Sequence, residues 1–281
     1  MPIVLENVSH IFMPGSAMSQ TALNDVSFQV EEGEFFCIIG HTGSGKTTLL
    51  QHMNGLVQPS SGKITVDGLD LSVKKQRVEA RSRVGLVFQY PEYQLFEETV
   101  SLDIAFGPKN LHVPEAEIKE RVEEAMLLVG LAPDLFADKS PFDLSGGEKR
   151  RAALAGILAM RPRYLLLDEP MAGLDPRGRQ SVIDLLQSLR KKTGCAIVMV
   201  SHSMDDVARN AERIAVLHKG SLVMLDTPSN VFAEPEKLLE LGLDIPQAAQ
   251  LALKLRERGI QAPAGAYREE ELYAFLLEAL S

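Results

Sequence analysis

Apolar and polar residues alternate in short stretches near the start of the chain, and fully apolar runs follow farther along. Residues 2–8 and 26–30 alternate as half-buried strands do, with a turn containing Gly and Ser between them. The continuous apolar run 35–39 is typical of a parallel strand that is buried on both faces. Further strand-like segments lie at 63–66, 84–88, 164–167, 196–200, 214–218 and 221–226. These segments predict the strands of an α/β core.

Helical periodicity separates some of these strands and dominates the end of the chain. Residues 115–129 carry apolar side chains at helical spacing, and the surrounding stretch has the same character. We interpret residues 90–162 as a helical insertion in the α/β core. Toward the C-terminus, the Ala- and Leu-rich stretches 246–258 and 269–280 predict two amphipathic helices around a Pro/Gly linker at 263–265.

The composition is that of an ordinary globular protein. The chain has 281 residues, of which 45% are hydrophobic and 24% are charged, which suits one large domain or one domain with a small appendage. The formal net charge of −9 argues against a nucleic-acid backbone or an anionic lipid surface as the main partner. If the protein works at a membrane, we therefore expect another protein to hold it there.

Targeting and membrane-spanning signals are not found in the sequence. Glu6 interrupts the apolar start of the chain, and no run approaches the roughly 18 apolar residues of a spanning helix. Cys37 and Cys195 lie in apolar strand-like runs without metal-ligand spacing, so we expect them to be small buried hydrophobes. These features predict a cytoplasmic protein.

A phosphate-binding loop follows the apolar run 35–39. The segment 40–47 fits the pattern G-x-x-x-x-G-K-[ST], and residues 48–54 have helical character. A Gly-rich turn exposes backbone N–H groups to a polyphosphate, and the following helix N-terminus adds a favourable dipole. We expect Lys46 to reach the β- and γ-phosphates of ATP, and the Thr47 hydroxyl to coordinate Mg²⁺. The predicted ATP-binding residues here are Gly40, His41, Thr42, Gly43, Ser44, Gly45, Lys46, Thr47 and Thr48.

Two carboxylates end the apolar segment 164–167. Asp168, at the mouth of the predicted strand, suits a water-mediated contact with Mg²⁺. Glu169 is placed to accept a proton from the attacking water. Solvated charges at a strand end are the plain alternative, but a phosphate-binding loop in the same chain favours the catalytic interpretation.

Three further polar residues are candidates for sensing the γ-phosphate. Gln89 follows a predicted strand and can hydrogen-bond both Mg²⁺ and water without adding charge. His202 also follows a predicted strand, where a histidine can equally be structural or solvated. Asp175 lies in a turn and can equally cap a helix that begins at Pro176. For Asp175 the two roles are compatible.

A second Gly-rich element, Leu144-Ser145-Gly146-Gly147-Glu148, precedes a strongly helical segment at 148–160. A serine hydroxyl and two glycine N–H groups at a helix start make a second anion site, and a simple N-cap is the alternative. If this pentapeptide caps a different helix from the phosphate-binding loop, the two elements cannot complete one site within one molecule. Together they imply a protein that completes its ATP sites by pairing.

These elements, in this order, resemble the ATP-binding cassette (ABC) ATPases. The resemblance covers roughly residues 3–228 and rests on 40–47, Gln89, 144–148, 167–169, 173–175 and His202. It implies an α/β fold of the P-loop NTPase class, with an ABC ATPase domain at 1–228 and a small C-terminal helical extension at 229–281. Within that domain it implies a RecA-like core at 1–89 and 163–228, an antiparallel β subdomain, and an inserted helical subdomain at about 90–162.

The same resemblance implies roles for further residues. Two subunits would pair head to tail, so that ATP held by Lys46 of one subunit meets the other subunit's Ser145, Gly146, Gly147, Glu148 and Asp175. Phe12 occupies the place of the aromatic residue that stacks on adenine, with His10 as the alternative. Glu148 stands where glutamine is commoner in the family, and Met171 where threonine or serine is frequent.

Two stretches narrow the resemblance to ATPases of energy-coupling factor (ECF) transporters, which import vitamins and trace-metal ions into prokaryotes. These stretches are residues 88–100 and 105–110. The second, or A-prime, ATPase of that system is matched at 39–43, 149–151, 175–179 and 201–206. The resemblance implies a Mg²⁺-dependent ATPase at the cytoplasmic face of the cell membrane, whose dimer closes on ATP and opens after hydrolysis.

It also implies partners and a docking surface. A sister ATPase would complete the dimer, with a homodimer as the alternative, beside a transmembrane coupling protein and a substrate-binding membrane subunit. Association with the membrane would then be indirect. The groove for a coupling helix would be formed by four exposed side chains, those of Tyr90, Tyr93, Leu95 and Phe96, unless they pack the insertion onto the core. The C-terminal helices would support the dimer.

Two other classes of protein stay open. Soluble ABC ATPases that act on ribosomes, DNA repair or chromosome structure usually have two cassettes, zinc modules or coiled-coil insertions, unlike this acidic chain with one cassette and two cysteines. A non-hydrolytic ATP-sensing subunit is disfavoured by Glu169 and His202. Within the ECF interpretation, substrate specificity would lie in a different polypeptide.

Overall fold

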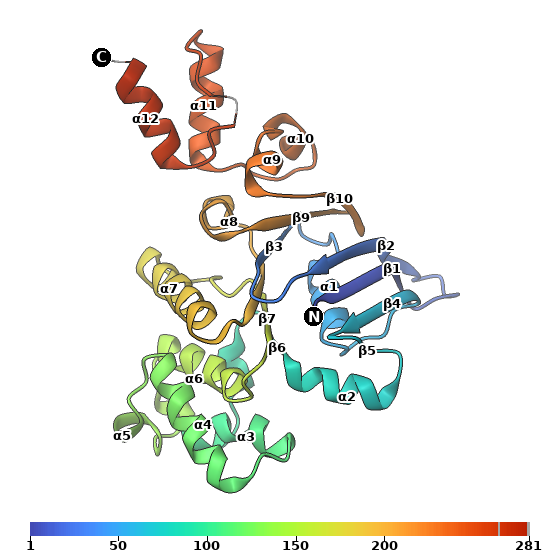
Figure 1. Cartoon of the computed structure of the whole chain (residues 1–281), viewed down its shortest axis with the longest axis vertical. Helices are drawn as coiled ribbons and strands as arrows, with labels where there is room; N and C mark the ends of the chain where they lie inside the picture. The colour runs from blue at the N-terminus through green and yellow to red at the C-terminus, as the bar shows by residue number, and fades with distance from the viewer. Residues whose placement is uncertain (264, 280–281) are drawn as a thin grey trace.

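The computed structural model describes residues 1–263 and 265–279, and these form two sheets (Figure 1). The first sheet is antiparallel and has the strand order β2-β1-β4-β5. Its strands are β1 (Ile3–Phe12), β2 (Gln20–Val30), β4 (Ser61–Val66) and β5 (Leu69–Asp70). Strands β1 and β2 are longer than the predicted 2–8 and 26–30, and only residues 13–19 separate them.

The second sheet has six strands in the order β10-β9-β3-β8-β7-β6. Strands β9, β3, β8, β7 and β6 are parallel, and β10 pairs antiparallel with β9 at the edge. The six are β3 (Phe35–Ile39), β6 (Val84–Val87), β7 (Tyr164–Asp168), β8 (Ala196–Val200), β9 (Arg213–His218) and β10 (Ser221–Asp226). The predicted α/β class is confirmed.

Both faces of the six-stranded sheet are buried, which explains the continuous apolar runs of its strands. On β3, the side chains of Phe36 and Ile38 belong to one core, shared with the first sheet and with helix α1 (Lys46–Met53). Phe35, Cys37 and Ile39 point to the opposite face and belong to a second core. Cys37 and Cys195 are buried free thiols, as expected.

Several helices gather beside β6 and β7, at the bottom of Figure 1. They are α3 (Val100–Asn110), α4 (Glu115–Leu128), α5 (Pro133–Phe136) and α6 (Gly146–Leu158), with 3₁₀ turns at Pro91–Gln94 and Pro141–Asp143. Helix α7 (Pro176–Thr193) lies above this group in Figure 1, beside the sheet, and α2 (Lys74–Arg83) precedes β6. The helical character predicted for 90–162 is confirmed, while the domain boundaries stay a prediction.

Among the described residues after β10, two short helices precede the two predicted ones. Helix α8 (Met204–Asn210) follows β8, and after β10 come α9 (Pro228–Phe232), α10 (Pro235–Glu240), α11 (Gln247–Glu257) and α12 (Glu269–Ala279). Helices α11 and α12 share a small core of their own, made of Ala248, Ala252, Ala262, Ala266 and Leu272. Ala264 of the predicted linker and Leu280 of the predicted last helix lie outside the described residues.

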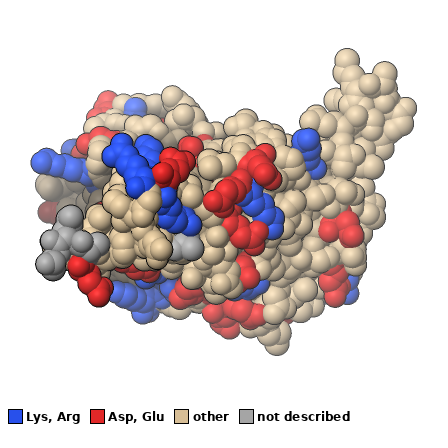
Figure 2. Space-filling view, turned by 90° about the horizontal axis from the view of Figure 1, so that it is seen from above, with Lys and Arg blue, Asp and Glu red and all other residues tan. Residues whose placement is uncertain are grey.

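Charge is mixed on the face of the molecule that is seen from above in Figure 2. Lys and Arg side chains lie among Asp and Glu side chains there, and the described residues form no continuous basic patch on this face. Within the part of the chain that the structure describes, none of the helices combines the length and the apolar character required to cross a bilayer.

Candidate active site

Four loops that carry the predicted site residues leave the same edge of the six-stranded sheet. They follow β3, β8, β7 and β6, which are neighbours in that order and run parallel. Because the carboxyl ends of parallel strands share one edge, the topology brings Lys46, His202, Glu169 and Gln89 to one place, as in other open α/β sheets.

The phosphate-binding loop needs its last glycine for two reasons. Gly45, the N-cap of α1, has a φ of 101°, which side chains other than hydrogen rarely tolerate. A Cβ at this position would lie 2.5 Å from the carbonyl oxygen of Ala22 in β2. The loop is therefore pressed against the first sheet, and the helix start that follows is fixed in direction.

Lys46 and Ser44 form a polar interior inside this loop. Lys46 is 6% exposed, and its Nζ donates to the carbonyl oxygens of Gly40, at 2.7 Å, and His41, at 2.9 Å. Burial lowers the pKa of Lys46, while the negative charges of Glu169 and Asp168 oppose this shift. Ser44 is buried, and its Oγ has no hydrogen-bond partner. An unpaired hydroxyl and an inward-facing ammonium fit an anion such as a phosphate.

Thr47 and Asp168 meet directly, which joins the loop to the end of β7. The Thr47 hydroxyl donates to Asp168 Oδ2 at 2.7 Å, and Asp168 is 6% exposed. Burial raises the pKa of Asp168, and the hydrogen bond from Thr47 acts in the opposite direction. Gln89 follows β6, the strand next to β7, and carries an amide oxygen. A hydroxyl, a carboxylate and an amide are hard oxygen donors of the kind that Mg²⁺ prefers.

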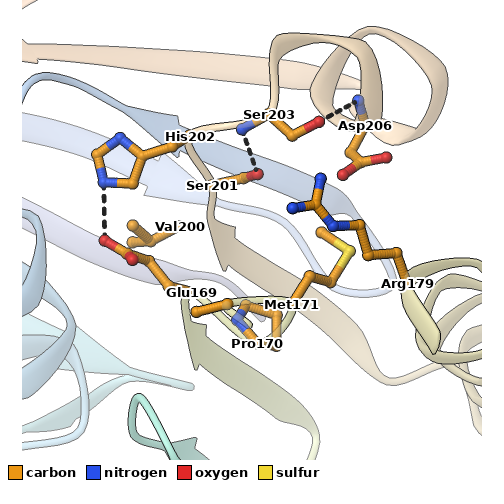
Figure 3. Close-up of a pocket in the computed structure, with 10 residues that line it drawn as sticks. Glu169, Pro170, Met171, Arg179, Val200, Ser201, His202, Ser203 and Asp206 are labelled. Atoms are coloured by element: carbon orange, nitrogen blue, oxygen red, sulfur yellow. Dashed lines mark hydrogen bonds and ion pairs between the residues drawn. The ribbon is translucent and has the colours of Figure 1, made fainter. Parts of the chain in front are cut away.

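Glu169 is held by the other two predicted residues. Gln89 Nε2 donates to Glu169 Oε2 at 3.1 Å, and His202 Nε2 lies 2.8 Å from Glu169 Oε1 (Figure 3). Glu169 adopts a left-handed backbone conformation, with a φ of 49°, directly after β7. This turn orients the carboxylate toward residues from both neighbouring strands. The structure thus brings together the three residues predicted to be catalytic.

A pocket of about 210 Å³ adjoins this carboxylate and is lined by Glu169, His202, Ser203, Arg179 and Asp206, among others. Arg179 of α7 and Asp206 of α8 face one another across it (Figure 3). The Ser203 hydroxyl caps α8 by accepting a hydrogen bond from the backbone N–H of Asp206, at 3.3 Å. His202 therefore lies at a fixed junction between β8 and α8.

The second Gly-rich element caps α6 and not α1, as the pairing argument requires. Glu148 N donates to Ser145 Oγ at 3.4 Å, and Ser145 N donates to Glu148 Oε2 at 2.8 Å, a complete capping box. The Ser145 hydroxyl also donates to Glu148 Oε2, at 2.7 Å, and this bond together with the one from Ser145 N lowers the pKa of Glu148. Glutamate at this position therefore has a local function, although glutamine is commoner in the family.

Asp175 lies at the start of a helix, and Phe12 lies at the end of a strand. Asp175 caps α7, since its Oδ1 accepts a hydrogen bond from Gly178 N at 2.9 Å. Phe12 ends β1 and is 41% exposed, with its ring edge-on to His10 at 4.5 Å. His10 is only 9% exposed, so of the two rings Phe12 is the one free to stack on a nucleotide base. Contacts with a second subunit stay predictions.

The predicted coupling residues divide into two groups. Tyr90 and Tyr93 are exposed on the surface, at 41% and 84%. Leu95 is half-buried against the core, contrary to the expectation that it is exposed, and with Phe96 it borders a largely apolar groove of about 400 Å³. Residues of α3, of α6 and of the turn after α6 that were not predicted from the sequence also line this groove: Phe106, Ala153, Gly156, Ile157 and Met160. Their helical spacing, for example in Ala153, Gly156, Ile157 and Met160, could have indicated a shared helix face.

The family profile described as "ABC transporter" matches residues 23–172. Relatives named energy-coupling factor transporter ATP-binding protein EcfA2 match over the whole chain. The one from Caldanaerobacter subterraneus subsp. tengcongensis is 52% identical over 100% of this chain and 98% of its own length. The one from Symbiobacterium thermophilum is 53% identical over 100% of this chain and 97% of its own length.

Solved structures of ABC cassettes have a similar fold. A structure of cbiO1 from Clostridium perfringens, described as part of the ABC transporter complex cbiONQ, has a TM-score of 0.73 and 36% identity, covering 85% of this chain and 94% of that chain. A dimeric ATP-binding cassette in a post-hydrolysis state with ADP and Pi has a TM-score of 0.70 and 29% identity, covering 80% of this chain and 98% of that chain.

Proposed function

Since this chain belongs to the ABC transporter family and, within it, to the ATP-binding proteins of energy-coupling factor transporters, we propose that it hydrolyses ATP to drive the import of vitamins or trace-metal ions. The observation that carries the proposal is the Glu169 carboxylate, which lies within hydrogen-bond distance of Gln89 and His202 at the edge of the sheet that also holds the phosphate-binding loop.

In the proposed reaction, Glu169 accepts a proton from a water molecule as the water oxygen attacks the γ-phosphorus of ATP. The bond from that phosphorus to the bridging oxygen breaks, and the electron pair leaves with ADP. His202 and Gln89 hold the carboxylate in place from its two sides. With phosphates bound, Lys46 would exchange its two carbonyl partners for phosphate oxygens.

Mg²⁺ would be held by the Thr47 hydroxyl, by Gln89 and, through water, by Asp168, and it would supply positive charge to the phosphates. The hydrogen bond between Thr47 and Asp168 keeps these two oxygen groups together before a metal ion arrives. Phe12, exposed at the end of β1, would stack on the adenine ring.

Hydrolysis would take place between two subunits. Ser145 and Gly147 lie at the start of α6, whereas the phosphate-binding loop leads into α1. Each would therefore contact ATP that is bound to a partner. Asp175, at the start of α7, would face the same junction. The partner would be a sister ATPase in a heterodimer, with a homodimer as the alternative, and helices α11 and α12 would support the pair.

The groove beside Phe96 would receive a helix of a transmembrane coupling protein. It is largely apolar, and Tyr90 and Tyr93 lie exposed on the same stretch of chain. A separate substrate-binding membrane subunit would select the cargo. The chain would thus work as a peripheral protein at the cytoplasmic face of the membrane, with a core ATPase unit at 1–228 and an extension at 229–281.

Affinity purification of the tagged chain from detergent-solubilised host membranes, followed by mass spectrometry, tests this proposal. We expect a sister ATPase and a multi-span membrane protein to be recovered with the chain, together with ATPase activity that needs Mg²⁺. Recovery of only ribosomal or DNA-associated proteins would refute the transport function.

A further inference from the structure

Arg150, near the start of α6, is a buried charged residue that joins three segments of the chain. It is 9% exposed. Its Nε and Nη2 donate to the two carboxylate oxygens of Glu92, at 3.2 and 3.3 Å, and its Nη1 donates to the carbonyl oxygen of Ala172, at 3.0 Å. The planar guanidinium can make all three contacts at once, whereas a lysine ammonium lacks this fork geometry.

Each of the three segments has a different place in the proposed function. Arg150 belongs to the helix that Ser145 caps, the proposed contact with a partner's ATP. Glu92 lies in the 3₁₀ turn Pro91–Gln94, between the exposed residues Tyr90 and Tyr93. Ala172 belongs to the turn after the catalytic carboxylate, since its N–H donates to the carbonyl oxygen of Glu169 at 3.1 Å.

The segment 89–92 is consequently fixed to the turn after β7 at two points. One connection is the hydrogen bond from Gln89 to Glu169, at 3.1 Å. The other runs from Glu92 through Arg150 to Ala172 and includes a residue of α6. The side chains of Glu92 and Arg150 are 18% and 10% exposed, so separating them would leave charges poorly hydrated. Movement of α6 or of the turn after β7 would therefore displace the 3₁₀ turn as well.

We propose that Arg150 is a positioning residue that transmits ATP binding from the nucleotide site to the surface formed by Tyr90 and Tyr93. This inference rests on the proposed function, because it needs ATP at the phosphate-binding loop. The hydrogen bonds of the Arg150 side chain go to Glu92 and Ala172, and not to the phosphate-binding loop or to Glu169. Replacement of Arg150 should leave ATP binding intact, and the surface formed by Tyr90 and Tyr93 should no longer respond to bound ATP.

Hydrogen–deuterium exchange of the full chain, with and without Mg²⁺ and a non-hydrolysable ATP analogue, measures both ends of this path. The variants are Arg150→Lys, which keeps the charge but loses the fork, and Glu92→Gln. The matched control is Arg161→Lys, because Arg161 makes an exposed ion pair with Glu124 at 2.6 Å. In the parent chain we expect the analogue to slow exchange in peptides covering 40–47 and 90–96.

In Arg150→Lys and Glu92→Gln we expect the effect of the analogue on 90–96 to fall by about tenfold, since a hydrogen bond to a charged group is lost. The effect on 40–47 should stay within about twofold of the parent, as it should at both peptides in Arg161→Lys. A response of 90–96 in Arg150→Lys equal to that of the control, or no response of 90–96 in the parent, would overturn the proposal. Absence of protection at 40–47 in the parent would instead refute ATP binding and with it the proposed function.

Discussion

Glu169→Gln separates the chemical role of this side chain from its structural role. The carboxylate accepts a hydrogen bond from Gln89 Nε2 at 3.1 Å and lies 2.8 Å from His202 Nε2. The substituted amide has the same shape. Its oxygen can still accept from Gln89, and its NH₂ group can donate to the imidazole of His202. The substitution therefore removes the proton acceptor and keeps the local geometry.

The expected loss follows from this difference. A general base contributes roughly 10² to 10⁴ to the rate of a reaction, which corresponds to about 3 to 5 kcal/mol of activation free energy. No hydrogen bond that orders the loop or the histidine is lost, so the thermal stability should stay close to that of the parent. The affinity for ATP should change by less than about threefold, since Lys46 and Thr47 are untouched.

Three measurements check these expectations on one preparation. Steady-state phosphate release gives kcat, equilibrium binding of a fluorescent ATP analogue gives Kd, and light scattering during gel filtration gives the mass of the ATP-bound form. We expect kcat to fall by about 10² to 10⁴, Kd to be retained, and a dimer to accumulate with ATP. Glu240→Gln, the same substitution at the exposed end of α10, should match the parent in all three.

Two results would refute this reasoning in different ways. Hydrolysis at the parent rate would show that Glu169 is not the base. A large loss of ATP affinity together with kcat would show that the carboxylate, and not only its ability to accept a proton, organises the nucleotide site.

Changes to other side chains are expected to have simpler outcomes. Because burial raises the pKa of Asp168, its charge costs folded-state stability above that pKa and costs less as the pH falls through it. Asp168→Asn should therefore raise the Tm of the nucleotide-free chain at about pH 8 and raise it less at about pH 4, and equal shifts would contradict this. Burial raises the pKa of Cys195 to about 12 and also raises the pKa of Cys37. Neither thiol should therefore react with an alkylating reagent at about pH 8 before the protein unfolds. Mass spectrometry that detected labelling of the native chain would contradict this. Tyr93 is 84% exposed, so Tyr93→Ser should change the free energy of unfolding by less than about 0.5 kcal/mol. It should reduce the amount of membrane partner that is recovered with the chain. Undiminished recovery would show that the docking surface lies elsewhere.

The central sheet was predictable from the sequence because its strands are buried on both faces. The predicted ranges 35–39 and 196–200 agree with the fully buried strands β3 and β8 residue for residue. The range 221–226 also agrees with β10, although that edge strand is only partly buried. A strand in this position is a continuous apolar run with polar loops at both ends, so its limits are visible without knowledge of its neighbours.

The antiparallel strands were predicted too short because a bulge interrupts their alternation. Asn7 and Asp25 have φ values of 50° and 53°, and the Asn7 side chain donates to Asp25 Oδ1 at 2.8 Å. The β1–β2 register shifts between Leu5 and Val8, so residues beyond this point change face. A pattern that assumes strict alternation stops at such a position, although both strands continue.

Helices with few buried residues were not predicted. Helix α2 has the sequence KKQRVEARSR and only Ala80 of it is buried, so it has almost no apolar stripe. Helices α9 and α10 have only 5 and 6 residues, and such short segments do not show a helical period of apolar side chains in the sequence. Their positions depend on packing against β9, β10 and each other, which is information from distant parts of the chain.

The candidate site shows the same limit at the level of single contacts. The motifs predicted that Gln89, Glu169 and His202 belong to one site, because each follows a strand of the same sheet. They did not predict that one carboxylate accepts from both neighbours, nor that Arg150 connects Glu92 to Ala172. Such pairs depend on side-chain direction across loops, which no local pattern contains.

Backbone strain at the ends of β6 and β7 gives these contacts a further meaning. Tyr90 and Glu169 adopt left-handed conformations, with φ values of 56° and 49°, which cost roughly 1 to 3 kcal/mol at residues of this kind. The strain persists only where surrounding contacts over-determine the chain. Here those contacts are the hydrogen bond from Gln89 to Glu169 and the fork of Arg150 on Glu92 and Ala172. A rearrangement that broke these contacts would therefore remove the restraint on both turns.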